Sequence, residues 1–371
     1  VVFVLAMVSF AFYLGKPVSR LLLLAGYFVI LVSQIIAIFY AQSRGPLLGL
    51  LGGVFVYFIL LGVTNRRLWL SWLAAGLAIA LGAFLIMFNT VQSPLIETLR
   101  ETPYVGRLGR VLQTEEGTGR VRVLIWEGVT DMLAWHEPIE FPGDDGGPDG
   151  LNALRPIIGY GPESMYVAYN SFYPPELGQF EKRNASPDRS HNETFDALVI
   201  TGLLGFVVYM LVFTSFFYFG LKWLGLIVER WQKGAFLGLW TLGGAVGAVA
   251  TWAWRGPVYV GVGIPVGVML GLMAYILVTV LAVTFRPGSQ RARGGSHWLL
   301  LLALFSAVVS HFVEIHFGIA IAATRTYFWV YAAMLVVIGV RLAAQSAEAE
   351  QVAVDSVAPA EQVNSEPRRR R

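Results

Sequence analysis

Long apolar stretches alternate with short polar junctions along most of the chain. Several of these stretches exceed the roughly 18 apolar residues that cross a bilayer as a helix. The pattern predicts nine membrane spans, at residues 1–14, 21–41, 46–63, 68–88, 196–220, 235–254, 258–285, 297–317 and 326–343. We therefore expect an all-α polytopic membrane protein with about nine transmembrane helices.

One polar segment, residues 89–195, interrupts this pattern and is far longer than an ordinary connection. Within it, residues 104–112 and 122–133 have the apolar spacing of helices, whereas residues 143–150 and 159–162 are rich in turn-forming residues. We expect this loop to fold into a small helical cap. The expected units are residues 1–88 (first helices), 89–195 (loop), 196–343 (second bundle) and 344–371 (a tail whose composition predicts disorder).

Composition narrows the class of protein further. The chain is 56% hydrophobic and only 14% charged, which excludes an ordinary soluble domain. It contains no cysteine, so disulfides, thiolate metal sites and a cysteine nucleophile are excluded. The apolar first residues, without an initiator Met or a charged leader, suggest that upstream sequence precedes them. We expect membrane lipids as partners and no nucleic acid.

Basic residues are distributed unequally between the two sides of the predicted bundle. In the short loops, one side holds only Arg44, Arg255 and Arg325. The other side holds Lys16, Arg20, Arg66, Arg67, Lys222, Arg230, Lys233, Arg286, Arg291, Arg293, Arg341 and the terminal arginines. Because cytoplasmic loops are enriched in Lys and Arg, the basic side is expected to be cytoplasmic. The long loop then faces outward from the cytoplasmic membrane.

The end of the long loop places an ionisable imidazole where water meets lipid. Arg189, His191 and Asn192 stand in a polar stretch that runs directly into an apolar span. One interpretation is that His191 and Asn192 only cap the helix that follows, a common role for such residues. The other is that His191 carries chemistry.

Arginines on the predicted outer side favour the second interpretation. Arg44, Arg122, Arg189 and Arg255 could each be ordinary helix-end arginines whose stems cover apolar surface. Several of them beside a histidine indicate something more, because guanidinium groups bind phosphate oxygens through charge-assisted, often bidentate bonds. A phosphate site at the membrane surface would suit a lipid-linked phosphate.

Two further groups are weaker candidates. His311 and Glu314 are one helical turn apart near the outer end of a span, where they could be functional or simply hydrated. Asp144, Asp145 and Asp149 suggest calcium, but their spacing does not match the EF-hand pattern. We expect solvated turns there and no metal.

Four motifs follow one another in a fixed order. They are Ser43-Arg44-Gly45 opening a span, Arg122 four residues before Trp126, Gly159-Tyr160-Gly161-Pro162, and Arg189-Ser190-His191-Asn192 running into Thr201-Gly202-Leu203-Leu204-Gly205. Each is weak alone. Together, with two of them in one long outward loop, they resemble the O-antigen ligase and polymerase superfamily over about residues 25 to 320.

The resemblance implies a membrane glycosyltransferase of the GT-C type. In ligases of this family a glycan passes from undecaprenyl pyrophosphate to a lipid A core sugar with inversion, without a metal or other cofactor. His191 matches the essential loop histidine of the family, Arg122 the arginine before the tryptophan, and Arg44 the arginine of the Ser-Arg-Gly motif. Arg189 is a looser match. The doubled arginine in Gly119-Arg120-Val121-Arg122 leaves Arg120 as a second candidate for the loop position.

We therefore expect His191 to act as a general base on the acceptor hydroxyl. Arg122, with Arg44 and Arg189, would bind the pyrophosphate and stabilise the negative charge of the leaving group. Asn192 would help to position the acceptor. Arg120 and Arg255 are further candidates for binding the pyrophosphate or the acceptor.

Other functions stay open at this point. A polymerase would use the same donor but take a second lipid-linked repeat as acceptor, and a surface acceptor other than lipid A fits the residues equally well. A small-anion transporter could also use outward arginines, and would need polar or broken helices near the bilayer centre. The glycine-rich segments at 243–247 and 261–271 are its support, although small residues also serve plain helix packing.

Overall fold

The computed structural model describes residues 17–41, 43–102, 117–140, 146–285 and 296–357. Within these ranges eight helices are long and apolar enough to cross a membrane. They are α2 (Pro17–Ala41), α3 (Arg44–Thr64), α4 (Leu68–Thr90), α9 (Glu193–Trp223), α10 (Arg230–Arg255), α11 (Val260–Phe285), α12 (Ser296–His316) and α13 (Ala322–Val357). The prediction of an all-α polytopic membrane protein is confirmed. The ninth predicted span, residues 1–14, lies outside the described residues.

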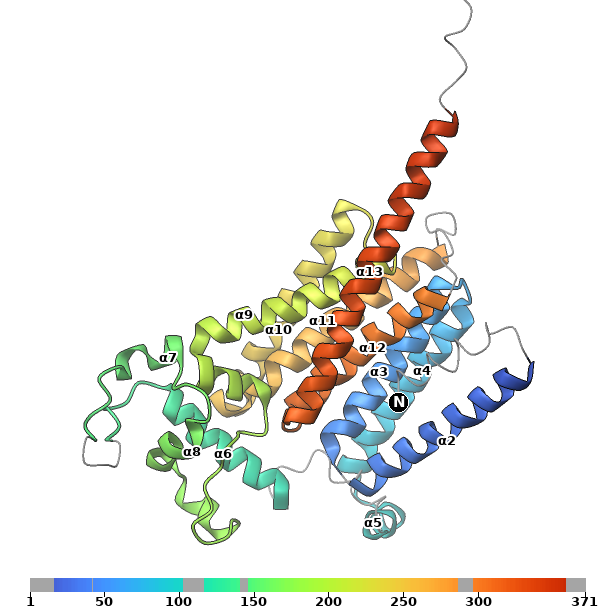
Figure 1. Cartoon of the computed structure of the whole chain (residues 1–371). Coiled ribbons are helices and arrows are strands. Elements are labelled where there is room, and N and C mark those ends of the chain that lie inside the picture. Colours follow the sequence, from blue (N-terminus) through green and yellow to red (C-terminus); the bar gives the residue numbers. More distant parts are fainter. Residues whose placement is uncertain (1–16, 42, 103–116, 141–145, 286–295, 358–371) are drawn as a thin grey trace, which may run out of the picture.

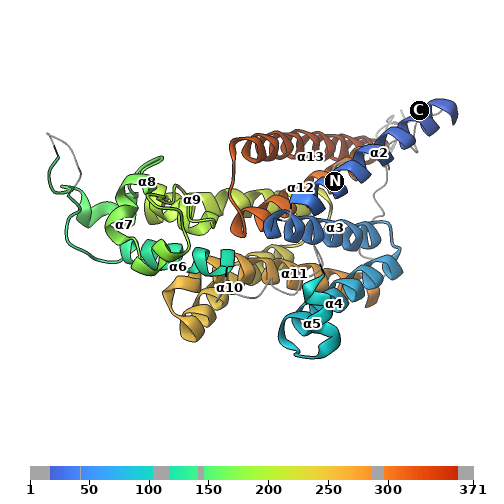
Figure 2. The same ribbon diagram turned by 90° about the horizontal axis from the view of Figure 1, so that it is seen from below.

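The long loop packs at one end of the bundle, as Figures 1 and 2 show. Its elements, with the short turn before α11, are α5 (Pro94–Glu101), α6 (Gly117–Leu133), η2 (Asn152–Leu154), α7 (Arg155–Ile158), α8 (Met165–Ala168), η3 (Tyr169–Phe172), η4 (Pro175–Gln179) and η5 (Pro257–Tyr259). The expected helix at 122–133 is part of α6, and the one expected at 104–112 lies outside the described residues. Residues 117–140 and 146–195 form a unit with a hydrophobic core around Leu124, Val129 and Tyr169, and we call this unit the cap.

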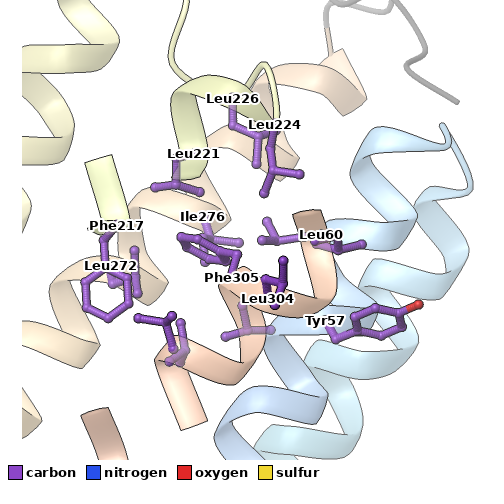
Figure 3. Close-up of a cluster of buried hydrophobic side chains, with 14 of the residues drawn as sticks. Tyr57, Leu60, Phe217, Leu221, Leu224, Leu226, Leu272, Ile276, Leu304 and Phe305 are labelled. Atoms are coloured by element: carbon purple, nitrogen blue, oxygen red, sulfur yellow. The ribbon is translucent and has the colours of Figure 1, made fainter. Parts of the chain in front are cut away.

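Helix α12 lies at the centre of the bundle. Its residues Leu304 and Phe305 are fully buried between side chains of α3, α9 and α11, as the close-up in Figure 3 shows. Large apolar side chains on the outer faces of the other helices stay exposed, as expected of surfaces that face lipid. The membrane helices are therefore arranged around α12.

Glycines let α3 approach α12 closely. Gly45, Gly49 and Gly53 recur every four residues on one side of α3. A Cβ atom on Gly49 would lie 2.5 Å from the carbonyl oxygen of Ser310, and one on Gly45 would lie 2.9 Å from that of Glu314. Only glycine fits such a contact, which fixes where the first residues of α3 lie against the end of α12.

The glycine-rich segments of α10 and α11 also serve packing. A Cβ atom on Gly247 would lie 2.0 Å from the carbonyl oxygen of Gly263, and one on Gly267 would lie 2.0 Å from that of Gly243. Small residues in this arrangement allow two membrane helices to touch along their backbones. These segments are thus explained by the contact between α10 and α11.

Helix α9 is broken at Gly202, whose φ of 64° and ψ of −170° are not helical. The break deprives the carbonyls of Val199 and Ile200 of their usual helical partners. They accept hydrogen bonds instead from the backbone N–H groups of Tyr160 (2.7 Å) and Gly161 (3.0 Å). Two of the sequence motifs, Gly159-Tyr160-Gly161-Pro162 and Thr201-Gly202, therefore form one joint between the cap and the bundle.

The end of the chain differs from the expectation. Helix α13 continues to Val357, past residue 344, where the composition predicts a disordered tail. The residues concerned are mostly Ala, Glu and Gln, which have high helix propensity and can extend a helix that a membrane span has already nucleated. Residues 358–371 lie outside the described residues.

Candidate functional site

The cap meets the bundle where several helix ends come together. Helix α6 carries Arg122, whose Nη1 donates a hydrogen bond of 2.8 Å to the carbonyl oxygen of Phe317, the residue that follows α12. The start of α3 reaches the same carbonyl, since a Cβ atom on Gly45 would lie 3.1 Å from it. Three segments far apart in the sequence thus place Arg44 and Arg122 at one point.

The charge of Arg44 affects the pKa of Arg122, as expected for two guanidinium groups at one point. The pKa of Arg122 is lowered first by burial and then by the positive charge of Arg44. Arginine nevertheless stays protonated at any working pH. Two cations held close together at a half-buried position make this point attractive to an anion, because an anion would relieve their repulsion.

His191 lies within electrostatic range of Arg122, and the residue before it, Ser190, is bound by Trp126 of the same helix α6. The His191 imidazole is partly buried, and its pKa is lowered to about 4, first by burial and then by the positive charge of Arg122, while Asp188 opposes the shift. The imidazole is therefore neutral at pH 7 and able to accept a proton. The structure brings together Arg44, Arg122 and His191, which belong to three of the four sequence motifs.

The backbone of His191 is strained. Its φ of 60° lies in the left-handed region, where a Cβ atom is crowded and which few residues other than glycine adopt, asparagine, aspartate and histidine more often than the rest. The preceding residue holds it there. The carbonyl of Ser190 accepts a bond of 2.8 Å from Nε1 of Trp126, and its N–H and hydroxyl both donate to Oδ1 of Asp196, at 2.7 and 2.8 Å. Such strain persists where neighbouring contacts dictate it, and it is commonest at functional sites.

The side chain of Asn192 joins the start of α9 to α11 and α12. Its Oδ1 accepts a bond of 3.2 Å from the N–H of Phe195, which caps α9, and its Nδ2 donates to the carbonyls of Gly261 and His316, each at 3.0 Å. The Gly261 carbonyl has no helical donor because Pro265, four residues later, lacks an N–H. The amide is fully buried and its bonds are all to protein groups. We therefore assign Asn192 a positioning role and not direct contact with the acceptor.

The doubled arginine on α6 separates into two different environments. Arg120 forms ion pairs with Glu176 (2.6 Å) and Glu127 (3.3 Å) on the outer surface of the cap. Arg122, two residues later, points to the bundle and acts on the pKa of His191. The geometry thus selects Arg122 as the residue at the site, and Arg120 belongs to the packing of the cap.

The remaining arginines lie further from the imidazole. Arg189 pairs with Glu163 at 2.5 Å, in the turn that follows the Gly159-Tyr160-Gly161-Pro162 motif, and so lies at the rim of the site. Arg255 ends α10, is exposed, and has its guanidinium 4.8 Å from the ring centre of Trp254. Among the described contacts, none joins Arg255 to His191.

The secondary candidates on α12 meet as expected. Nδ1 of His311 lies 3.4 Å from Oε2 of Glu314, and the imidazole stacks on Phe328 of α13 with ring centres 4.6 Å apart. A second ion pair, between Arg325 and Glu193, was not predicted from the sequence. The guanidinium of Arg325, at the start of α13, binds the buried carboxylate of Glu193 at 3.1 Å. The only advance signal was the position of Arg325 on the predicted outer side.

Of the three aspartates in the acidic turn, Asp149 lies within the described residues and forms an ion pair with Arg155. Contrary to the expectation of a solvated turn, Asp149 is buried and binds Arg155 with both carboxylate oxygens, at 2.7 and 2.9 Å. This contact holds the pKa of Asp149 below its usual value. Asp144 and Asp145 lie outside the described residues.

Comparison of the chain with protein-family models, curated proteins and solved structures gives no match. The functional argument therefore rests on the residues themselves and on the geometry that brings Arg44, Arg122 and His191 together.

Proposed function

We propose that this chain is a membrane glycosyltransferase of the O-antigen ligase and polymerase type. It would move a glycan from undecaprenyl pyrophosphate to an acceptor hydroxyl, on a lipid A core or another surface acceptor, at the outer face of the cytoplasmic membrane. The observation that supports this most strongly is the convergence of two arginines and one neutral, strained histidine at the end of a membrane bundle.

The chemistry of the site suits a pyrophosphate donor. Arg44 and Arg122 provide two permanent positive charges, and a pyrophosphate provides at least two negative ones. The site lies where the helices end, so a polyprenyl chain could remain among the lipids while its head group reaches the arginines. A soluble phosphate ester would have no reason to be bound at this level.

His191 removes the proton of the acceptor hydroxyl while the acceptor oxygen forms a bond to the anomeric carbon of the donor sugar. The bond between that carbon and the pyrophosphate oxygen breaks, and its electron pair stays on the oxygen. Arg122 and Arg44 stabilise this charge as it grows. Attack opposite the leaving group inverts the anomeric carbon.

Donor binding would also activate the base. The charge of Arg122 is one cause of the low pKa of His191. A bound pyrophosphate would offset that charge and raise the pKa, so the imidazole becomes a stronger base only when the donor is present.

The pH dependence of transfer tests this coupling. A base must be deprotonated, so transfer is lost as pH falls through the pKa of His191. We expect kcat/KM for the donor, which reports the free enzyme, to fall only near pH 4. The acid limb of kcat, which reports the donor complex, should lie at higher pH. Initial rates measured from about pH 3 to pH 8 would show this, and coincident limbs for kcat/KM and kcat would contradict the coupling.

The two neighbouring arginines provide a matched pair of variants. Arg122→Gln should lower kcat/KM for the donor by about 100-fold, because one charge-assisted donor to the leaving group is lost. Arg120→Gln, two residues away on the same helix, should retain transfer within a few-fold, since Arg120 binds Glu176 and Glu127. Equal losses in both variants would remove Arg122 from the site.

The function itself is tested with purified protein, a glycan on undecaprenyl pyrophosphate and a panel of acceptors, with and without EDTA. Product on a lipid A core would indicate a ligase, and chain growth on a second lipid-linked repeat would indicate a polymerase. Folded protein that binds the donor but gives no product with any acceptor would contradict the proposal.

One observation could be read in favour of a transporter, namely that α9 is broken at Gly202. Broken helices in transporters offer free backbone groups to an ion. Here the carbonyls of Val199 and Ile200 bind N–H groups of the cap. The break therefore serves as a joint between cap and bundle, and we rank transport below transfer.

A further inference from the structure

The cap exposes an apolar face near the point where it joins the bundle. Leu151, Leu154, Ile157 and Ile158, in and just before η2 and α7, are each between 42% and 47% exposed. Their spacing of three to four residues puts them together on one side of this short helical segment, which we call the α7 segment (residues 151–158). A cluster of large aliphatic residues in contact with water would be unfavourable, so this face is expected to have a partner.

The position of the α7 segment identifies that partner. It packs on the break of α9, where a Cβ atom on Gly202 would lie 2.3 Å from the carbonyl of Ile157. Immediately after the break, Leu203 and Leu204 are 53% and 60% exposed, and the exposed apolar surface of α9 continues through Val208. The face of the α7 segment is thus adjacent to a surface that faces lipid.

The length of α9 shows how deep the joint lies. The part of α9 after the break runs from Leu203 to Trp223, which at about 1.5 Å per residue is roughly 30 Å. This matches the thickness of the hydrocarbon core, about 30 Å. Gly202 therefore lies at the boundary between hydrocarbon and head groups, and the α7 segment lies beside that boundary.

The polar groups of the segment are paired as a position near lipid demands. Arg155 binds Asp149 with both carboxylate oxygens, donates to the carbonyl of Gly159 (3.2 Å), and lies over the ring of Tyr160, 5.1 Å from its centre. The backbone N–H groups at the joint bind Val199 and Ile200. A paired charge and satisfied backbone groups reduce the cost of leaving water.

We propose that the α7 segment is a membrane-surface anchor, whose apolar face enters the acyl region of the same bilayer that α9 crosses, in the leaflet at the cap end. The ligand is the lipid surface itself. The segment ties the cap to the membrane, and because the same joint is continuous with Ser190 and His191 through α9, it keeps the site at the level of a lipid-linked substrate. This inference concerns membrane contact and does not depend on glycosyl transfer.

Spin labels can test the anchor directly, because the chain contains no cysteine. Single variants Leu154→Cys and Ile157→Cys would be labelled in the full-length protein, reconstituted in vesicles of phosphatidylethanolamine and phosphatidylglycerol. Val208→Cys serves as the lipid-facing reference and Lys182→Cys as the water-facing one, since all four positions are exposed. Collision with oxygen, enriched in lipid, is compared with collision with a water-soluble nickel chelate.

We expect the labels at positions 154 and 157 to favour oxygen over the nickel chelate, with a depth parameter of the same sign as at position 208 and opposite to that at position 182. Accessibility to the nickel chelate equal to that at position 182 would overturn the proposal. Low accessibility to both reagents would also overturn it, because it would mean that protein covers the face. Quenching of a bimane on the same cysteines by brominated lipids gives an independent second measurement, expected at 154, 157 and 208 only.

Discussion

Replacing His191 with alanine or glycine is expected to lower transfer by at least about 100-fold, the usual contribution of a general base. The imidazole is neutral at pH 7 because burial and Arg122 hold its pKa at about 4. The nearby His316 precedes Phe317, whose carbonyl binds Arg122, but its imidazole is buried with Nδ1 2.6 Å from the carbonyl oxygen of Phe312. Both variants should remain inserted and folded, because the loop is held by bonds from Ser190 and Asn192 and not from the imidazole.

The two variants should differ in stability although both lose the imidazole. His191 has a φ of 60°, where a Cβ atom costs about 1 to 2 kcal/mol. His191→Ala keeps that Cβ atom, whereas His191→Gly removes it. We expect the glycine variant to be more stable than the alanine variant by about 1 kcal/mol, measured by thermal or denaturant unfolding in detergent. Loss of transfer with unchanged or improved folding would separate chemistry from structure.

A matched control is available in the same cap. His136 is also half-buried, but its imidazole contacts the hydroxyl of Tyr160 (2.9 Å) and the ring of Phe172, and its described contacts do not include Arg44 or Arg122. His136→Ala should retain transfer within a few-fold. Near-normal transfer by His191→Ala would overturn the assignment of His191 as the base, and equal loss in both histidine variants would indicate a general defect of the cap.

The membrane helices could be predicted from sequence because the bilayer imposes a simple rule. Each span must supply about 20 apolar residues and satisfy its own backbone, so hydropathy alone marks it. Eight of the predicted spans correspond to described helices. The break at Gly202 could not be predicted in this way, because the hydropathy of α9 is uninterrupted there and the cause is a contact with Gly159 of the cap.

The candidate site was predictable as a set of residues but not as an arrangement. The motifs singled out Arg44, Arg122 and His191, which the structure places together. The sequence could not distinguish Arg122 from Arg120, because the difference arises from which side of α6 faces Phe317 and which side faces Glu176. Such contacts join segments distant in the chain, and spacing along the sequence does not contain them.

Asn192 shows the same limit more sharply. Its place before a helix predicts a cap, and the bond from Phe195 agrees with that prediction. Its second role arises from Pro265, which leaves the carbonyl of Gly261 without a donor in another helix. The Oδ1 atom of Asn192 caps α9, and its Nδ2 atom donates to the carbonyl of Gly261 in a distant helix. Only the first of these roles can be predicted from the neighbouring sequence.

Asn192→Asp is therefore expected to be strongly destabilising although the two side chains have nearly the same shape. The introduced carboxyl keeps an oxygen for the N–H of Phe195, and aspartate is as good a cap as asparagine. It offers no N–H to the carbonyls of Gly261 and His316, which are bound at 3.0 Å in the native protein. Two buried acceptors without donors should cost about 2 to 6 kcal/mol.

Unfolding in detergent would measure this loss, with Asn184→Asp as the control. Asn184 is exposed and lies in the same part of the loop, so its substitution should change the unfolding free energy by less than about 0.5 kcal/mol. Similar effects at both positions would mean that the amide of Asn192 does not hold α9, α11 and α12 together.

The pH dependence of this variant distinguishes a lost donor from a simple packing defect. Burial against two carbonyls would raise the pKa of the introduced carboxyl above its value in the unfolded chain. The part of the penalty that comes from the charge is therefore absent below the unfolded pKa, and stability is lost as pH rises through the folded one. The deficit relative to the native protein should shrink on acidification without disappearing, because a protonated carboxyl has one O–H for two carbonyls. A deficit that is constant with pH would point to packing. A deficit that shrinks would point to the two carbonyls of Gly261 and His316. The contact of Asn192 with α9, α11 and α12 would then be the support that holds the neighbouring, strained His191 in place.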